Sequence, residues 1–212
     1  MWEYIDKMLI GLLVTLRLSF SALAFGLVLG IILALSRVYG KRSISFIASA
    51  YIELFRDTPL TVQLFIIYFG LPRFGVLFSG ITAVTLALGL NSAAYQAEYL
   101  RGAIESIRRG QMDAALSIGL TRIQAIRHVI LPQALRLALP SWSNEAAYLP
   151  KYSSVAFLVA VPELMSNAKI IATDTFRPME VYLLTALIYL ACITAISKSL
   201  DIVHEKYKLT ID

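Results

Sequence analysis

Several apolar runs, each about twenty residues long or longer, dominate the 212-residue sequence. A helix rises about 1.5 Å per residue, so about twenty residues cover the roughly 30 Å hydrocarbon core of a membrane. Hydrophobic residues make up 58% of the chain and charged residues only 16%, which is far from the composition of a soluble domain. The sequence therefore predicts an all-α membrane protein, with residues 1–212 forming a single transmembrane domain.

Five membrane spans are predicted from these runs, at residues 9–35, 44–70, 80–101, 129–149 and 181–202. A cleaved signal peptide is the alternative for the first span, because "ALA" at 22–24 looks like a cleavage site. The apolar run continues to about Leu35, however, so we expect an uncleaved span. Gly26 and Gly30 have the GxxxG spacing of closely packed helices, although glycine is also common in ordinary membrane helices.

Basic residues lie at the ends of the apolar runs, and the net charge is +5. This distribution is typical of membrane insertion, so no binding to nucleic acid is expected. The positive-inside rule assigns the Lys- and Arg-rich connections to the cytoplasm. Those connections hold Arg37, Lys41, Arg42, Arg101, Arg108, Arg109, Arg122, Arg127, Lys198, Lys206 and Lys208. We therefore predict a multi-pass protein of the cell (inner or cytoplasmic) membrane, with its N-terminus outside and its C-terminus in the cytoplasm.

Three chemistries are not expected from this chain. The single Cys192 lies in an apolar run, so we expect neither a disulfide nor a metal site. His128 and His204 lie in basic surroundings and are interpreted as surface residues. No GxxxxGKS or GxxxxGKT motif occurs, and "GKRS" at 40–43 lacks its spacing, so the chain alone is not expected to bind ATP through a P-loop or to act as an enzyme.

One polar, helix-forming segment at 113–135 interrupts the apolar pattern. It predicts two short helices, at about 111–118 and 122–129, with a turn at Gly119 and a cap at Thr121. The result is an elbow at about 111–128 on the cytoplasmic membrane face. A short apolar ridge with a basic rim suits a groove on a cytoplasmic partner, and the alternative is an amphipathic helix that rests on lipid headgroups.

The elbow resembles a motif of the permeases of binding-protein-dependent ABC importers. Their pattern is Glu-Ala-Ala, three residues, Gly, nine or more residues, then Ile, any residue, Leu and Pro. This chain has "DAALSIG" at 113–119, with Asp in place of Glu, and "ILP" at 130–132, with no residue between Ile and Leu. "YIELFRDTPLTVQL", "NSAAYQAEYLRGAIESI" and "GQMDAALSIGLTRIQAIRHVILPQALRLALPSWSNE" are similar to the polar amino acid importers in particular.

This resemblance implies a type I ABC importer fold with about five transmembrane helices and a cytoplasmic coupling elbow. It implies a cytoplasmic ABC ATPase dimer as partner, which binds ATP and Mg in place of this chain. It further implies four other partners: a second permease copy or a homologous permease, an extracytoplasmic amino-acid-binding protein, an amino acid substrate and the lipid bilayer. The expected ATPase-coupling residues are Asp113, Ala114, Ala115, Leu116, Ile118, Gly119, Leu120 and Arg122.

Polar residues within the spans are candidates for a solute passage. Pro59 removes a backbone donor and disfavours helical geometry at Thr58, which predicts a break that faces protein or water. A charge at the centre of a span costs about 2.5–3.5 kcal/mol, so each charged side chain needs a partner. Structural pairs are one possibility, and a site for a zwitterion is the other. The candidate pairs are Arg56 with Asp57, Glu98 with Arg101, and Glu145 with Lys151. The candidate passage residues, which the resemblance also implies in part, are Arg56, Asp57, Thr58, Asn91, Tyr95, Glu98, Asn144 and Glu145.

The sequence departs from the family after "NE" at 144–145, because Lys151 is followed by Tyr and two Ser where the family usually has an acid. This departure leaves the identity of the amino acid open. Two other classes of function are alternatives to an ABC importer permease. A proton- or sodium-coupled carrier usually has internal repeats, and none is visible here. A membrane scaffold without transport activity would use the same elbow to bind an intracellular partner.

Overall fold

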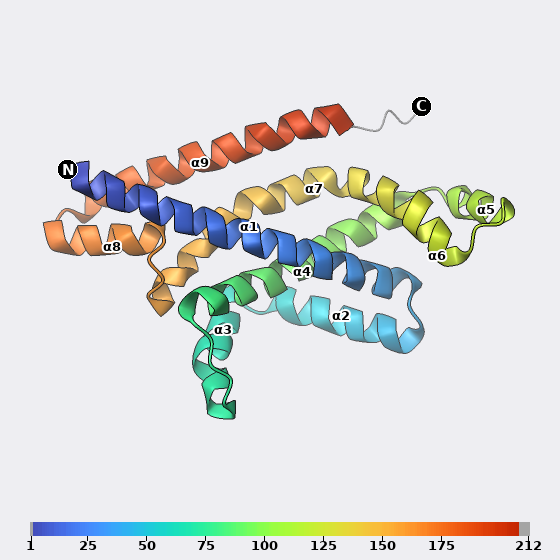
Figure 1. Ribbon diagram of the computed structural model, residues 1–212, viewed down its shortest axis with the longest axis horizontal. Helices are drawn as coiled ribbons and strands as arrows, with labels where there is room; N and C mark the ends of the chain where they lie inside the picture. The colour runs from blue at the N-terminus through green and yellow to red at the C-terminus, as the bar shows by residue number, and fades with distance from the viewer. Residues whose placement is uncertain (1, 208–212) are drawn as a thin grey trace.

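The computed structural model of the protein describes residues 2–207, and Lys208, used above to predict orientation, lies outside them. Every regular element within the described residues is helical, which confirms the all-α prediction (Figure 1). The elements are α1 (Trp2–Tyr39), α2 (Arg42–Asp57), α3 (Leu60–Phe65), the π-helix η1 (Ile66–Gly70), the 3-10 helix η2 (Leu71–Phe74), α4 (Gly80–Ser106), α5 (Gly110–Ser117), α6 (Arg122–Ala125), the π-helix η3 (Ile126–Ile130), α7 (Leu131–Tyr152), the 3-10 helix η4 (Ser153–Val159), α8 (Leu164–Thr175) and α9 (Pro178–Tyr207).

The predicted spans differ in apolar character. Tyr4–Tyr39 and Pro178–Lys206 are each long and apolar enough to cross a membrane, and a third candidate is the pair Arg122–Val159 and Leu164–Thr175, which is bent by 54°. α4 has sufficient length, at 27 residues, but carries polar side chains such as Gln96 and Glu98. Neighbouring helices cover much of α4, so its polar side chains lie against protein rather than lipid.

α1 and α4 form the most extensive helix pair and lie side by side in the centre of the molecule (Figure 1). A Cβ atom at Gly26 would lie 2.6 Å from Gln96 Nε2 and 3.2 Å from the backbone nitrogen of Ala93. A Cβ atom at Gly30 would lie 3.0 Å from Gln96 Cβ. Any side chain at either glycine would therefore push the helices apart, so the GxxxG spacing marks close packing in this structure.

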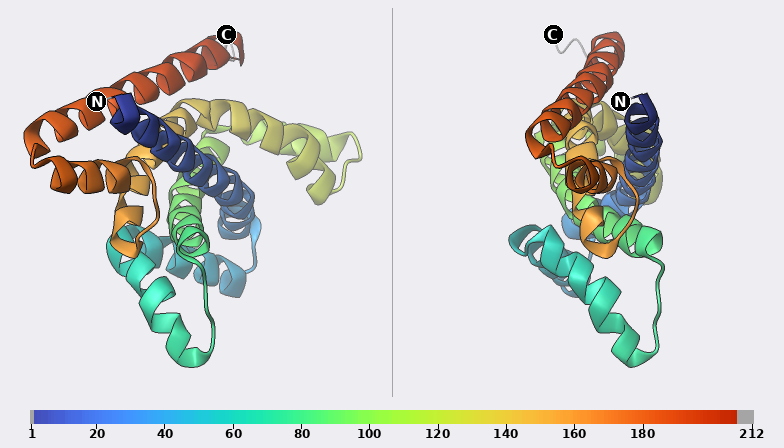
Figure 2. Two further views of the ribbon diagram at one scale, coloured as in Figure 1. Left: turned by 60° about the vertical axis from the view of Figure 1, so that its left-hand side comes forward. Right: turned by 90° about the vertical axis from the view of Figure 1, so that its left-hand side faces the viewer.

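The predicted break in the second span is present. Thr58 has extended backbone angles, with φ −108° and ψ 143°, and it separates α2 from α3. After the break, α3, η1 and η2 project away from the other helices as an arm, and the chain then returns to the start of α4 (Figure 2). Residues 44–70 are therefore two helical segments in different directions, rather than one straight span.

The segment at 153–175, between the predicted spans 129–149 and 181–202, is not a simple connection, because it contains η4 and α8. The fully buried Glu163 caps α8 by accepting hydrogen bonds from the backbone nitrogens of Met165, at 2.8 Å, and Ser166, at 2.6 Å. It also accepts hydrogen bonds from Thr15 of α1, at 3.3 Å, and Tyr189 of α9, at 3.2 Å. One carboxylate thus joins the two most apolar helices to α8.

Candidate functional site

The elbow has the turn and the cap predicted for it. Gly119 has φ +92°, a left-handed conformation that residues with a side chain rarely adopt. Thr121 begins α6 in a capping box: its side chain accepts from the backbone nitrogen of Gln124 at 3.4 Å, and its own backbone nitrogen donates to Gln124 Oε1 at 2.8 Å. The predicted helix at 122–129 does not end there, because α6 continues through η3 into α7. Pro132 lies within this continuous helical run, shortly after the π-helix η3.

The elbow lies at one end of the molecule (Figures 1 and 2). It presents an exposed apolar ridge. Ile118 is 78% exposed and Ile123 is 77% exposed. Ala115, in contrast, is buried, and so is Ala125 of α6. The small side chain of Ala115 allows α5 and the segment after it to approach closely, so this predicted contact residue holds the elbow together. Of the other predicted coupling residues, Leu120 is half-buried and the rest are exposed, namely Asp113, Ala114, Leu116, Ile118, Gly119 and Arg122.

A cavity of about 310 Å³ lies beside the break between α2 and α3. Arg56 lies on this cavity, with its guanidinium carbon 5.4 Å from the centre of the Tyr95 ring. The cavity brings together five of the predicted passage residues from α2, the break and α4, and it adds Tyr152 from the end of α7. Its lining consists of Arg56, Asp57, Thr58, Pro59, Leu60, Asn91, Tyr95 and Tyr152. Sequence analysis missed Tyr152, although the neighbouring departure at Lys151 was a signal for it.

Two amide side chains stabilise the broken helix at this cavity. Gln63 Nε2 donates to the carbonyl oxygens of Phe55, at 2.9 Å, and Thr58, at 3.0 Å, where the end of α2 leaves backbone acceptors without helical donors. Asn91 Nδ2 donates to the same Phe55 oxygen at 2.8 Å and to Gln63 Oε1 at 3.2 Å. Asn91 therefore fixes the geometry of the break as well as lining the cavity.

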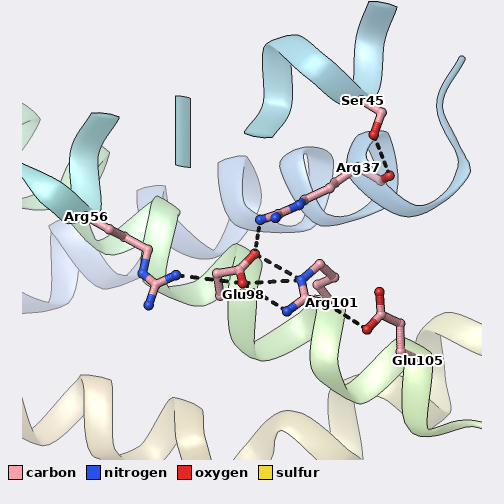
Figure 3. Close-up of polar contacts among 6 residues, drawn as sticks. All are labelled: Arg37, Ser45, Arg56, Glu98, Arg101 and Glu105. Atoms are coloured by element: carbon pink, nitrogen blue, oxygen red, sulfur yellow. Dashed lines mark hydrogen bonds and ion pairs between the residues drawn. The ribbon is translucent and has the colours of Figure 1, made fainter. Parts of the chain in front are cut away.

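Glu98 lies next to this cavity at the centre of an ion-pair cluster (Figure 3). It forms the predicted pair with Arg101 of its own helix, at 3.0 Å, and a hydrogen-bonded pair with Arg37 of α1. It also lies 3.7 Å from Arg56 Nη1, which pairs here and not with Asp57 as the structural alternative supposed. The cluster thus joins α1, α2 and α4.

Asn144 and Glu145 are not among the lining residues of this cavity. Asn144 is exposed, whereas Glu145 is buried and accepts a hydrogen bond from Ser92 Oγ at 2.6 Å. The alternative pairing of Glu145 with Lys151 is absent from residues 2–207; Lys151 Nζ lies 4.0 Å from the centre of the Tyr148 ring instead. Glu145 faces α4 because it lies on the buried side of α7, and sequence spacing alone did not identify that side.

The fold, the elbow and the cavity at the helix break define a class of protein. Comparisons with known proteins identify that class. Residues 26–208 match the family described as the binding-protein-dependent transport system inner membrane component, and the chain belongs to this family. Amino-acid permeases are among its relatives. The probable amino-acid ABC transporter permease protein YckA of Bacillus subtilis (strain 168) is 42% identical, over 97% of this chain and 96% of that protein. The probable glutamine ABC transporter permease protein GlnM of the same organism is 36% identical, over 91% of this chain and 89% of that protein.

Solved structures agree with this assignment. A chain of an amino acid ABC transporter with histidines has a TM-score of 0.88 and 38% identity, and the match covers 97% of this chain and 96% of that one. The MetNI methionine ABC transporter shares the fold, with a TM-score of 0.79 and 21% identity over 97% and 98% of the two chains. The protein is therefore an inner-membrane permease with the type I ABC importer fold. More narrowly, it is an amino-acid ABC transporter permease.

Proposed function

We propose that this permease forms the passage for a polar or charged amino acid and couples it to ATP hydrolysis by a separate cytoplasmic ATPase dimer. ATP and Mg are bound by that ATPase, and the chain alone is not an enzyme. The observation that carries the proposal is the cavity at the helix break, where polar residues of separate segments meet within otherwise apolar helices. Broken helices at membrane depth are tolerated where they face protein or a water-filled cavity.

The lining of the cavity supports a zwitterionic substrate. The Arg56 guanidinium suits a carboxylate, because its planar fork can donate two parallel hydrogen bonds. The Asp57 carboxylate is exposed beside it and suits an ammonium group. A volume of about 310 Å³ is at the small end of the range for ligand pockets, which fits a single amino acid. Glu98, Asn144 and Glu145 lie outside this lining, and we propose that they border the passage at other stages of transport.

The exposed ridge of the elbow supports the coupling role. Ile118 and Ile123 are exposed apolar side chains on a segment that is rigidly capped and turned, which suits insertion into a groove. Exposed arginines surround the ridge, and we place this end of the molecule in the cytoplasm on that ground. The N-terminus then lies outside, where the amino-acid-binding protein delivers its substrate.

A second permease, identical or homologous, completes the passage in this proposal. The arm formed by α3, η1 and η2 exposes large apolar side chains, among them Phe74 at 82% and Phe69 at 57%. Few other helices of the same chain contact this arm. A two-fold pair of permeases, with about ten spans, can enclose a passage that five spans would leave open to lipid.

Uptake into proteoliposomes tests the function. The permease is purified from its native host with its bound partners, reconstituted, and supplied with labelled glutamine, arginine and histidine. Uptake that requires ATP inside the vesicles supports the proposal. Uptake driven by an ion gradient without ATP would identify a secondary carrier. No uptake of any of these amino acids would favour a membrane scaffold without transport activity.

Labelling of single cysteines tests the orientation. After Cys192 is replaced, a cysteine at Asp6 should react with an impermeant maleimide in intact cells, whereas one at Gln111 should react only after lysis. The reverse pattern would place the elbow outside and exclude an ATPase contact.

A further inference from the structure

The three arginines around Glu98 are held unequally (Figure 3). Arg101 donates from Nε at 3.1 Å and 3.2 Å and from Nη2 at 3.0 Å, and Arg37 donates a hydrogen bond from Nη1. Arg56 Nη1 lies 3.7 Å from Glu98 Oε2, which is an ion-pair distance but too long for a hydrogen bond. Arg56 is therefore the most weakly bound member of the cluster.

Arg56 also differs from the other two arginines in its surroundings. Its side chain is 41% exposed, against 26% for Arg37 and 28% for Arg101, and it alone of the three lines the cavity. Besides its ion pair with Glu98, the Arg56 guanidinium packs over the face of the Tyr95 ring. A guanidinium that stacks on a ring keeps its donors free for a carboxylate at the ring edge.

We propose that Arg56 exchanges between Glu98 and the α-carboxylate of the amino acid in the cavity, so that loading the cavity removes the ion pair that joins the end of α2 to Glu98 of α4. This inference rests on the proposed function. Both carboxylates carry one negative charge, and a substrate can draw Arg56 away because it offers two hydrogen bonds where Glu98 offers none at this distance. The equilibrium between Arg56 paired with Glu98 and Arg56 turned to the cavity shifts by the difference in substrate affinity between these two states.

The remaining contacts determine which part of the molecule is loosened. Glu98 keeps Arg37 and Arg101, and Arg101 Nη1 donates to Glu105 at 2.6 Å, nearer the elbow. The start of α2 stays attached to α1, because Ser45 Oγ donates to the carbonyl oxygen of Arg37 at 2.9 Å (Figure 3). At the end of α2, next to the Thr58 break, the Phe55 carbonyl keeps its hydrogen bond from Asn91 of α4 at 2.8 Å. Occupancy of the cavity therefore loosens this end of α2 by one ion pair without detaching it.

The exchange makes an unusual prediction, which is that removing an acid beside the cavity tightens binding. In the Glu98→Gln variant, Arg56 has no competing carboxylate, so the binding-competent state is more populated. Calorimetry with arginine and with glutamine, on the purified complex of permease and ATPase, should give Kd values about twofold to fivefold lower than for the natural protein. Glu105→Gln is the matched control, because Glu105 belongs to the same network without contacting Arg56, and its Kd values should not change.

A second comparison tests the carboxylate itself. Agmatine is arginine without its α-carboxylate, so the natural protein should bind arginine more tightly than agmatine. In Arg56→Gln the Kd for arginine should rise towards that for agmatine, whereas Arg37→Gln should preserve the preference. Equal losses for arginine and agmatine in Arg56→Gln would overturn the proposal.

The outcomes separate this inference from the function on which it rests. If the natural complex binds neither arginine, histidine nor glutamine, the proposed function fails. If it binds one of them and Glu98→Gln binds it equally or more weakly, the exchange is wrong and the function stands. Should Glu98→Gln fail to fold, Glu98→Asp is the second test. Its shorter side chain weakens the long ion pair with Arg56, so it should also lower the Kd.

Discussion

The elbow and the cavity at the helix break are held together in opposite ways. The elbow depends on contacts within a few residues, such as the Thr121 to Gln124 capping box and the left-handed Gly119. The cavity depends on contacts between distant residues: 28 positions separate Asn91 from its bonding partner Gln63. An exposed segment with local contacts can change its surroundings without unfolding, whereas a cavity between helices changes only when the helices move. The two regions therefore suit contact with a partner and response to a substrate, respectively.

The largest expected effect comes from breaking the turn of the elbow. Gly119→Pro cannot adopt φ +92°, so α5 and α6 lose their relative orientation. We expect ATP-dependent uptake to fall by about 5-fold to 150-fold, the usual range of a coupling free energy, with the thermal unfolding temperature unchanged. Uptake and ATP hydrolysis are measured together in proteoliposomes. Gly110→Ala is the control, because nothing lies near its Cβ position; normal coupling in Gly119→Pro would exclude the elbow as the ATPase contact.

The next largest effect concerns the support of the cavity. Asn91→Ala leaves Gln63 Oε1 without its Asn91 donor and removes one donor from the Phe55 carbonyl. We expect a loss of about 1–3 kcal/mol in the free energy of unfolding, together with reduced uptake. Thermal unfolding of the purified permease measures the stability. Asn144→Ala, at an exposed position, should leave stability unchanged, and equal stability of the two variants would show that the break needs no support from Asn91.

A smaller effect is expected at the buried acid of α7. Glu145→Gln keeps the size of the side chain and weakens the hydrogen bond from Ser92, so unfolding should require about 1 kcal/mol less. Because Glu145 lies outside the cavity lining, uptake of arginine, histidine and glutamine should fall by similar factors. Lys151→Met removes the contact with the Tyr148 ring but no Glu145 pair, so both effects should be smaller than in Glu145→Gln. A loss confined to arginine and histidine would instead place Glu145 in contact with the substrate.

The smallest effect is expected at the cap of α6. Thr121→Ala removes the capping box and costs about 1 kcal/mol, but only within the elbow. Hydrogen exchange at residues 122–125 should become about fivefold faster, while exchange in α4 stays constant. Ser117→Ala is the control, because its side chain bonds only to the carbonyl of Asp113 at an exposed site. Faster exchange in both α6 and α4 would show that the elbow is not energetically independent of the helices.

The same contrast explains what the sequence could predict. The turn at Gly119, the cap at Thr121 and the break before Pro59 each follow from the conformational preferences of single residues, and all three are present. The assembly of Arg56 and Tyr95 at one cavity followed from spacing and family resemblance.

Features that depend on helix packing were harder to predict. Tyr152 reaches the cavity because α7 packs on α4, and Glu163 joins Thr15 to Tyr189 across 148 and 26 positions of sequence. No local pattern encodes such contacts. Of the three structural pairs proposed from spacing, Glu98 with Arg101 is present. The other two, Arg56 with Asp57 and Glu145 with Lys151, are absent from the described residues, because side-chain direction, which spacing does not give, decides them.

The glycine contacts between α1 and α4 restrict how the permease can move. The space at Gly30 accepts a hydrogen atom but no Cβ atom without displacement, since a Cβ would lie 3.0 Å from Gln96 Cβ. Sliding α1 by one turn towards its N-terminus would bring Ala34 to that place, and sliding it the other way would bring Ala22 to the place of Gly26. Both displacements create a steric clash, so α1 and α4 move together as one rigid body. Opening and closing of the passage then requires other elements to move relative to this pair, and the end of α2 next to the Thr58 break is the one that the proposed Arg56 exchange loosens.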